Sequence, residues 1–189
     1  MTHLVDQYGL AFLFVIVALE SAGAWLPGET ALIAAAVLAS QGQFPLSAVV
    51  AIAAAAAILG DNLGYWIGRT FGRGILERFE RVRRLLPRAE RFFAKHGGKA
   101  VFLARFIAGL RVTAAWMAGV GQMPWWRFLF WNACGGIAWA IGIGVLAYYA
   151  GRAAADAASQ YGLYGAAGVV AVALVVLVAV RLWGHRALG

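Results

Sequence analysis

Six charged side chains lie inside stretches of sequence that are otherwise apolar, and these residues are the best candidates for chemistry. They are Glu20, Glu29, Asp61, Arg105, Arg111 and Arg127. An ionised group in hydrocarbon costs roughly 2.5–3.5 kcal/mol on insertion scales, so such groups must pair, take up protons or line water. Carboxylates can carry protons, and guanidinium forks bind phosphate oxygens bidentately while staying charged. The residue types therefore leave two interpretations, a structural cluster of salt bridges or a functional site within the membrane.

The surrounding stretches identify an integral membrane protein. Hydrophobic residues make up 63% of the 189-residue chain and charged residues 13%, about half the roughly 25% of soluble domains. A soluble fold of this length has too little interior to hide that much apolar surface. The lack of Lys and Arg in residues 1–8 argues against a cleaved signal peptide.

Three of the apolar stretches are long enough to cross a bilayer as helices, which takes about 20 residues. They are 44–68, 125–150 and, with its flanks, 163–180.

Two further stretches, 9–39 and 100–123, each contain a helix breaker and two ionisable groups. Pro27 and Gly28 divide the first, and Gly109 divides the second. A turn between the two charges of a stretch lets both face one site, and unwound backbone at membrane depth is tolerated only inside protein or a cavity. We therefore expect both stretches to be re-entrant helical hairpins. The predicted fold is a single all-α membrane domain over 1–189, with two opposed hairpins and about three transmembrane helices.

The crossing stretch after each predicted hairpin has a face of small residues at every fourth position. These residues are Gly60, Gly64 and Gly68 in one stretch, and Asn132, Gly136, Ala140 and Gly144 in the other. Such faces let helix backbones approach closely in lipid, and they would also permit a homodimer. The order of hairpin, small-faced span, hairpin and small-faced span predicts a weak inverted repeat, the arrangement that transporters use to place a site at the midplane.

The segment 69–99 carries 10 of the 16 basic residues. The positive-inside rule places it and the C-terminus in the cytoplasm of a multi-pass cell-membrane protein. Apolar residues alternate with its arginines, which predicts an amphipathic helix lying on the membrane and broken near Pro87. This cluster explains the net charge of +8, so we expect no nucleic-acid partner.

Two further residues have local predictions. Asp61 and Tyr65 share a helix face, so the phenol could hydrogen-bond the carboxylate. Arg127 lies among aromatic residues and is expected to be an interfacial anchor outside the site.

Several motifs in order closely resemble the DedA family of membrane proteins, also called SNARE-associated or VTT-domain proteins. The resemblance covers about residues 9–150. The motifs are Glu20, Leu26-Pro27-Gly28-Glu29-Thr30, the run Gly60 to Arg69, Phe102 to Ile107, Gly109-Leu110-Arg111, Ala118-Gly119 and the run Asn132 to Trp139. The chain has Ala108 where the family usually has proline, which leaves Gly109 as the main helix breaker.

The resemblance implies a flippase-like or scramblase-like transporter. Family members are implicated in moving undecaprenyl phosphate or phospholipids between leaflets, often with proton dependence. Arg105 and Arg111 would bind the lipid phosphate, and Glu20, Glu29 and Asp61 would couple protons. Supporting positions around them would be Pro27, Gly28, Tyr65, Gly109 and Asn132.

One alternative stays open, a proton-dependent antiporter of small ions that uses the same acids without lipid. An enzyme is not expected, because no histidine lies in the apolar stretches and Cys134 has no basic neighbour. A single cysteine also excludes a disulfide framework or a cysteine-based zinc site, and no cofactor or metal is expected.

Overall fold

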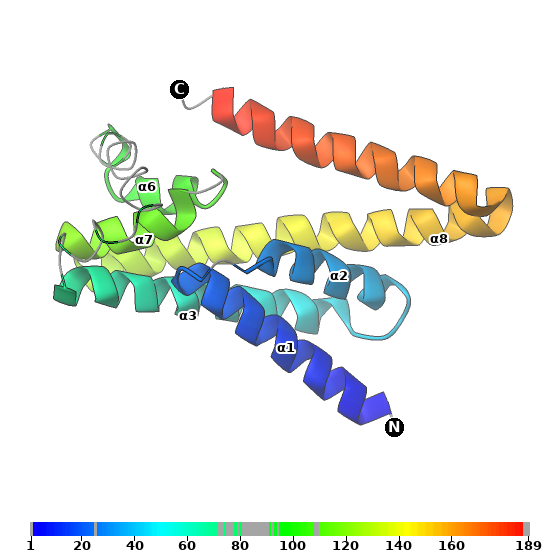
Figure 1. Cartoon of the computed structure of the whole chain (residues 1–189), viewed down its shortest axis with the longest axis horizontal. Helices are drawn as coiled ribbons and strands as arrows, with labels where there is room; N and C mark the ends of the chain where they lie inside the picture. The colour runs from blue at the N-terminus through cyan, green and yellow to red at the C-terminus, as the bar shows by residue number, and fades with distance from the viewer. Residues whose placement is uncertain are drawn as a thin grey trace.

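The computed structural model describes residues 2–24, 26–71, 74, 78, 80, 91, 93, 95–107 and 110–186. Its longer elements are all helices, gathered around the two longest ones (Figure 1). They are α1 (Thr2–Ala22), α2 (Gly28–Ser40), α3 (Leu46–Phe71), α6 (Lys99–Ala104), α7 (Leu110–Val120) and α8 (Trp125–Arg186). Most of the predicted amphipathic segment, including Pro87, lies outside the described residues, and so do Ala108 and Gly109.

Among the described residues, two helical segments are long and apolar enough to cross a membrane. They are Leu46–Phe71, which is α3, and Trp125–Ala157, the first part of α8. Figure 1 shows that α8 reverses direction in its orange part, so its last part runs back antiparallel to its first. The predicted crossing stretches 125–150 and 163–180 both fall within α8, and the second stays a prediction.

The first predicted hairpin is interrupted four residues earlier than Pro27. Gly23 has a φ of 126°, a left-handed conformation that favours glycine, and it ends α1. The Ala24 N–H reaches back to the Leu19 carbonyl at 2.9 Å, which satisfies a carbonyl at the helix end. Pro27 then occupies the N-cap position of α2, without a side-chain capping hydrogen bond. The 13 residues of α2 span only ~20 Å, too short to cross a bilayer alone.

The second predicted hairpin also consists of short helices. α6 has six residues and ends at Ala104, and α7 has 11 residues, or ~16 Å. Neither could cross a hydrocarbon core of ~30 Å. The helix breaks and the short helices α2, α6 and α7 are compatible with re-entrant hairpins. The 21 residues of α1, however, span ~31 Å, enough to cross a bilayer, so both hairpins stay predictions.

The small-residue faces pack closely, as predicted. A methyl group on Gly60 would overlap the Ala18 carbonyl of α1, and one on Gly68 would overlap the Trp116 carbonyl of α7. Gly136 of α8 faces a side chain of α3. α3 is thus the central helix, because it contacts α1, α7 and α8 at distances that only glycine allows.

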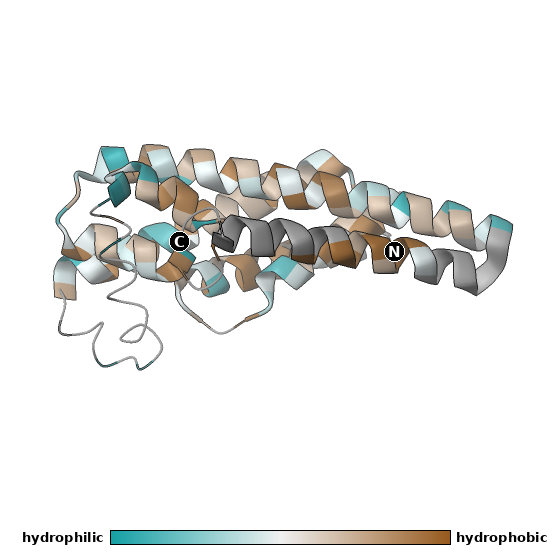
Figure 2. Ribbon diagram, turned by 90° about the horizontal axis from the view of Figure 1, so that it is seen from above, coloured by the Kyte–Doolittle hydropathy of each residue, from teal (hydrophilic) through white to brown (hydrophobic). Residues whose placement is uncertain are grey.

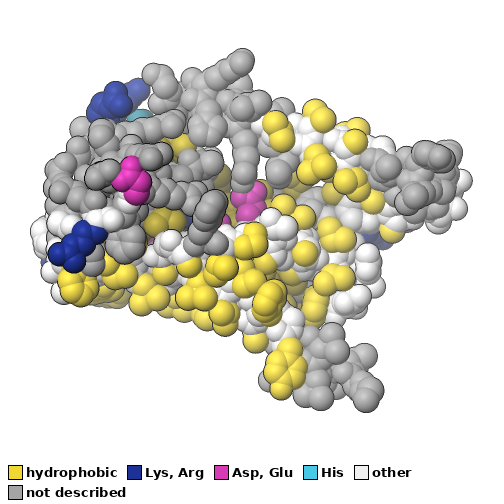
Figure 3. All heavy atoms as spheres, in the orientation of Figure 1, with side chains coloured by type: hydrophobic (Ala, Val, Ile, Leu, Met, Phe, Trp, Pro, Cys, Tyr) yellow, Lys and Arg dark blue, Asp and Glu magenta, His cyan; other side chains and the backbone are white. Residues whose placement is uncertain are grey.

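The described surface is rich in large apolar side chains. Figure 3 shows hydrophobic side chains over much of the described face formed by α1 and α3. Figure 2 shows hydrophobic residues along α3 and along the coloured part of α8. The side chains at least 47% exposed include Phe12, Val15 and Leu19 of α1, Leu59, Leu63 and Trp66 of α3, and Trp126, Phe130, Ile137 and Ile141 of α8. Water would disfavour so extended an apolar surface, whereas lipid matches it.

Candidate functional site

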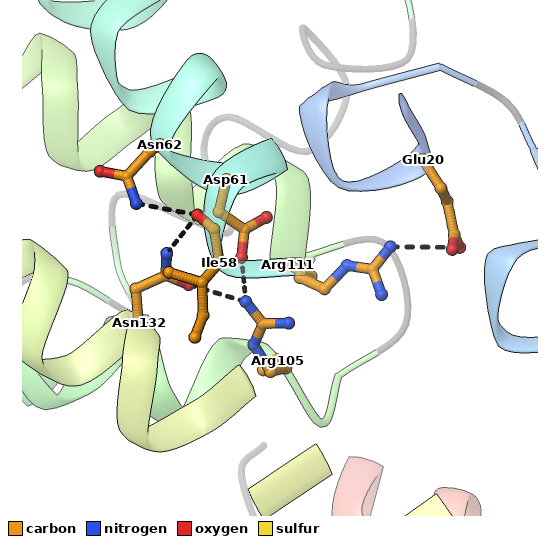
Figure 4. Close-up of polar contacts among 7 residues, drawn as sticks. All are labelled: Glu20, Ile58, Asp61, Asn62, Arg105, Arg111 and Asn132. Carbon is orange, nitrogen blue, oxygen red and sulfur yellow. Dashed lines mark hydrogen bonds and ion pairs between the residues drawn. The ribbon is translucent and has the colours of Figure 1, made fainter. Parts of the chain in front are cut away.

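A buried ion pair joins Arg105 to Asp61 (Figure 4). Arg105 follows directly after α6, and Asp61 lies within α3, beside the close contact between α3 and α1. Arg105 Nη2 donates to Asp61 Oδ2 and also to Asn132 Oδ1 of α8, at 2.7 Å. The exposed fractions of the arginine and aspartate side chains are only 1% and 4%. Three elements that are distant in the sequence therefore meet at one guanidinium group.

A second ion pair lies beside the first and joins Arg111 to Glu20. Arg111 is in the first turn of α7, and Glu20 is near the end of α1, so the pair connects the two predicted hairpins. Arg111 Nη2 lies 3.1 Å from Glu20 Oε1, and Figure 4 shows the arginine extended toward the glutamate. The side chains are 13% and 21% exposed, so this pair is more accessible than the first.

Two neighbouring residues shape the surroundings of this second pair. The guanidinium carbon of Arg111 lies 5.8 Å from the ring centroid of Trp139, a cation–π distance. A methyl group on Gly28 would overlap Glu20 Oε2. The glycine after Pro27 therefore makes room for the carboxylate where the two helices of the first hairpin meet.

The two ion pairs are close enough to interact electrostatically with each other. Among the residues that the structure describes, three buried polar atoms of these pairs have no hydrogen-bond partner: Arg105 Nη1, Asp61 Oδ1 and Glu20 Oε2. Buried polar groups are normally hydrogen-bonded, so unpartnered atoms around two guanidinium groups are a functional signal. The site has donors and acceptors left for an anion and a proton.

In the described part of the chain, no group of three or more His, Cys, Asp and Glu side chains could hold a metal ion.

The other predicted residues take different places. Glu29 lies in the first turn of α2 and is partly buried, and Pro27 occupies the N-cap position of that helix. Gly109 lies outside the described residues. Arg127 is exposed in the first turn of α8, and its role as an interfacial anchor stays a prediction.

The predicted bond between Tyr65 and Asp61 is wrong. The Tyr65 phenol donates to the Met123 carbonyl at 2.6 Å and accepts from Arg69 Nη1 at 2.8 Å. The chain that leaves α7 presents this carbonyl beside the ring, while one Asp61 oxygen is bound by Arg105. Tyr65 thus joins the end of α7 to α3 instead of supporting the carboxylate.

Sequence reasoning missed the role of Trp139, which it included only as the end of a motif. A signal was present, because Trp139 lies seven residues after Asn132, two helical turns further along the same face. That face carries the Asn132 contact to Arg105 as well as the ring beside Arg111.

Comparison with known proteins agrees with this architecture. A family model described as the VTT domain matches residues 26–149. The chain is 33% identical to the protein DedA of Escherichia coli over 162 residues, which cover 80% of this chain and 74% of that protein. The chain belongs to the DedA family of VTT-domain proteins.

Other relatives of this DedA-family protein are named as membrane proteins. An uncharacterized membrane protein of Synechocystis is 39% identical over 156 residues, which cover 80% of this chain and 72% of that protein. An uncharacterized membrane protein of Mycobacterium bovis is 44% identical over 150 residues, which cover 74% of this chain and 67% of that protein. No solved structure matches. Family membership and the apolar helices together identify a membrane protein.

Proposed function

We propose that this protein moves a phosphate-bearing lipid, such as a polyprenyl phosphate or a phospholipid, between the leaflets of the cell membrane, coupled to protons. The proposal depends on one observation, the adjacent ion pairs Arg105–Asp61 and Arg111–Glu20. Each arginine is paired with a carboxylate that can accept a proton. Each arginine can therefore exchange that carboxylate for the phosphate of a lipid. Two adjacent guanidinium groups match the oxygens of one phosphate.

The proposed cycle begins with both arginines held by their own carboxylates. A proton taken up by a carboxylate releases its arginine, and the lipid phosphate replaces the lost negative charge. Arg111 exchanges first, because its pair is the more exposed one. The headgroup then passes between the hairpins while the hydrocarbon tail stays in lipid. Segment 69–99 and the C-terminus lie on the cytoplasmic side in this proposal.

Transport by the purified protein in proteoliposomes tests the phosphate clamp. The variants are Arg105→Ala and Arg105→Lys, with Arg152→Ala as a control because Arg152 is exposed on α8. A lysine keeps the charge but loses the planar fork, so both Arg105 variants should move a labelled phospholipid or polyprenyl phosphate far more slowly than wild type. Near-normal transport by both would rule out the clamp.

The same vesicles distinguish lipid transport from ion antiport. Movement of labelled lipid that depends on the proton gradient supports the proposal. Proton-coupled ion flux without lipid movement would support the antiporter instead, and hydrolysis of the lipid phosphate would indicate an enzyme.

A further inference from the structure

Asn132 contacts Arg105 beside the carboxylate of Asp61. Its oxygen accepts from Arg105 Nη2, the same nitrogen that binds Asp61. Its side chain is almost fully buried, at 1% exposure of the residue. One guanidinium nitrogen is therefore shared between an anion on α3 and a neutral amide on α8 (Figure 4).

The orientation of the Asn132 amide is fixed by a second contact. Asn132 Nδ2 donates to the Ile58 carbonyl of α3 at 3.1 Å. A carbonyl accepts and cannot donate, so the nitrogen must face Ile58 and the oxygen must face Arg105. Asn132 cannot turn away without losing both bonds.

We propose that Asn132 is a positioning residue that keeps Arg105 in place when the ion pair between Arg105 and Asp61 breaks. Because the Asn132 amide is uncharged, it leaves Arg105 able to bind a phosphate in place of Asp61. A neutral oxygen holds a guanidinium more weakly than a carboxylate does. When Asp61 takes up a proton, Arg105 keeps one partner, stays aimed at the site, and still lacks an anion. The incoming phosphate supplies that anion. This inference rests on the proposed function.

The test is to place a carboxylate at this position with Asn132→Asp. The added charge should hold Arg105 permanently and slow lipid transport by about tenfold at neutral pH, since charge-assisted hydrogen bonds are roughly twice as strong as neutral ones. Acidification should restore much of the rate, because the protonated side chain regains a donor for Ile58 and loses its charge.

Asn62→Asp is the matched control. Asn62 Nδ2 also donates to the Ile58 carbonyl, at 2.8 Å, but its oxygen accepts from Trp125 Nε1 and not from Arg105. Both variants lose the same donor to the same carbonyl, and only one adds charge beside the arginine. The control should transport at near the wild-type rate, with an unchanged pH profile. Equal losses in both variants, or a wild-type rate and pH profile for Asn132→Asp, would overturn the inference.

A readout independent of transport separates this inference from the proposed function. The side-chain nitrogen NMR signals of Arg105 report how tightly its guanidinium is held, through hydrogen exchange with water. Asn132→Asp should slow that exchange several-fold relative to wild type and to Asn62→Asp. If the exchange slows but wild type moves no lipid, the proposed function fails and the positioning role stands. If the exchange is unchanged, the positioning role fails.

Discussion

Removing the charge of Asp61 should destabilise the protein much more than removing the charge of Glu20. In Asp61→Asn, Arg105 would stay buried at 1% exposure without a counter-ion, and breaking a buried pair in this way costs about 3–5 kcal/mol. In Glu20→Gln, Arg111 is 13% exposed and still rests beside an indole ring, so the cost should be only about 1 kcal/mol.

Thermal unfolding of the purified variants in one detergent measures this difference. For a chain of this size, 1 kcal/mol corresponds to a change in Tm of roughly 2–4 °C. Asp61→Asn should therefore lower the Tm by about 6–20 °C, and Glu20→Gln by about 2–4 °C. The double variant Asp61→Leu, Arg105→Leu should recover most of the stability, because apolar residues often replace a buried ion pair without loss. It should nevertheless transport no lipid.

Two results would refute this reasoning. Equal losses of stability in the two single variants would mean that burial does not determine the energetic importance of the pairs. Wild-type transport by the double leucine variant would mean that the Arg105–Asp61 pair is only a structural salt bridge.

Three further predictions concern the packing and the surroundings of the arginines. Gly119→Ala should lower the free energy of unfolding by about 1–3 kcal/mol, because the methyl group would overlap the Tyr65 carbonyl, whereas Gly142→Ala, with no atom within 4 Å, should be neutral or slightly stabilising in thermal unfolding. Tyr65→Phe should cost about 0.5–1.5 kcal/mol in the same assay, because the phenol no longer donates to the Met123 carbonyl, although Arg69 Nη1 still donates to that carbonyl at 3.2 Å. Trp139→Phe should transport lipid faster than Trp139→Leu, because only an aromatic ring offers a face to the Arg111 cation, and equal rates would exclude that contact.

The energetics of lipid made part of the site predictable from the sequence. Unpaired charges are too costly in hydrocarbon, so three acids (Glu20, Glu29 and Asp61) were expected to meet Arg105 and Arg111, with one acid left over. The structure pairs Asp61 with Arg105 and Glu20 with Arg111. The sequence did not reveal which acid binds which arginine. That choice depends on how α1 and α7 cross α3, and the crossing is set by backbone contacts at several glycines.

Local signals were less reliable where tertiary contacts compete with them. Pro27 and Gly28 indicated a break, yet α1 already ends at Gly23, because a glycine at positive φ ends a helix as effectively as a proline. Tyr65 has the right spacing to bond Asp61, but a carbonyl from a residue 58 positions away is its partner. Helix spacing shows which residues of one helix could contact each other. It does not show which hydrogen-bond partners a distant segment of the chain brings next to them.

The two ion pairs also connect the halves of the chain, and this has a consequence for transport. Both acids come from the N-terminal half, on α1 and α3, and both arginines come from the C-terminal half, Arg105 directly after α6 and Arg111 in the first turn of α7. Replacing either acid by a ligand phosphate therefore removes an attraction between the halves. The glycine contacts between α3 and α7 do not depend on charge, so they would keep the helices together during the exchange. Movement is then expected where the ion pairs are, at the end of α1 and the start of α7, while the packing of α3 on the rest of α7 stays fixed.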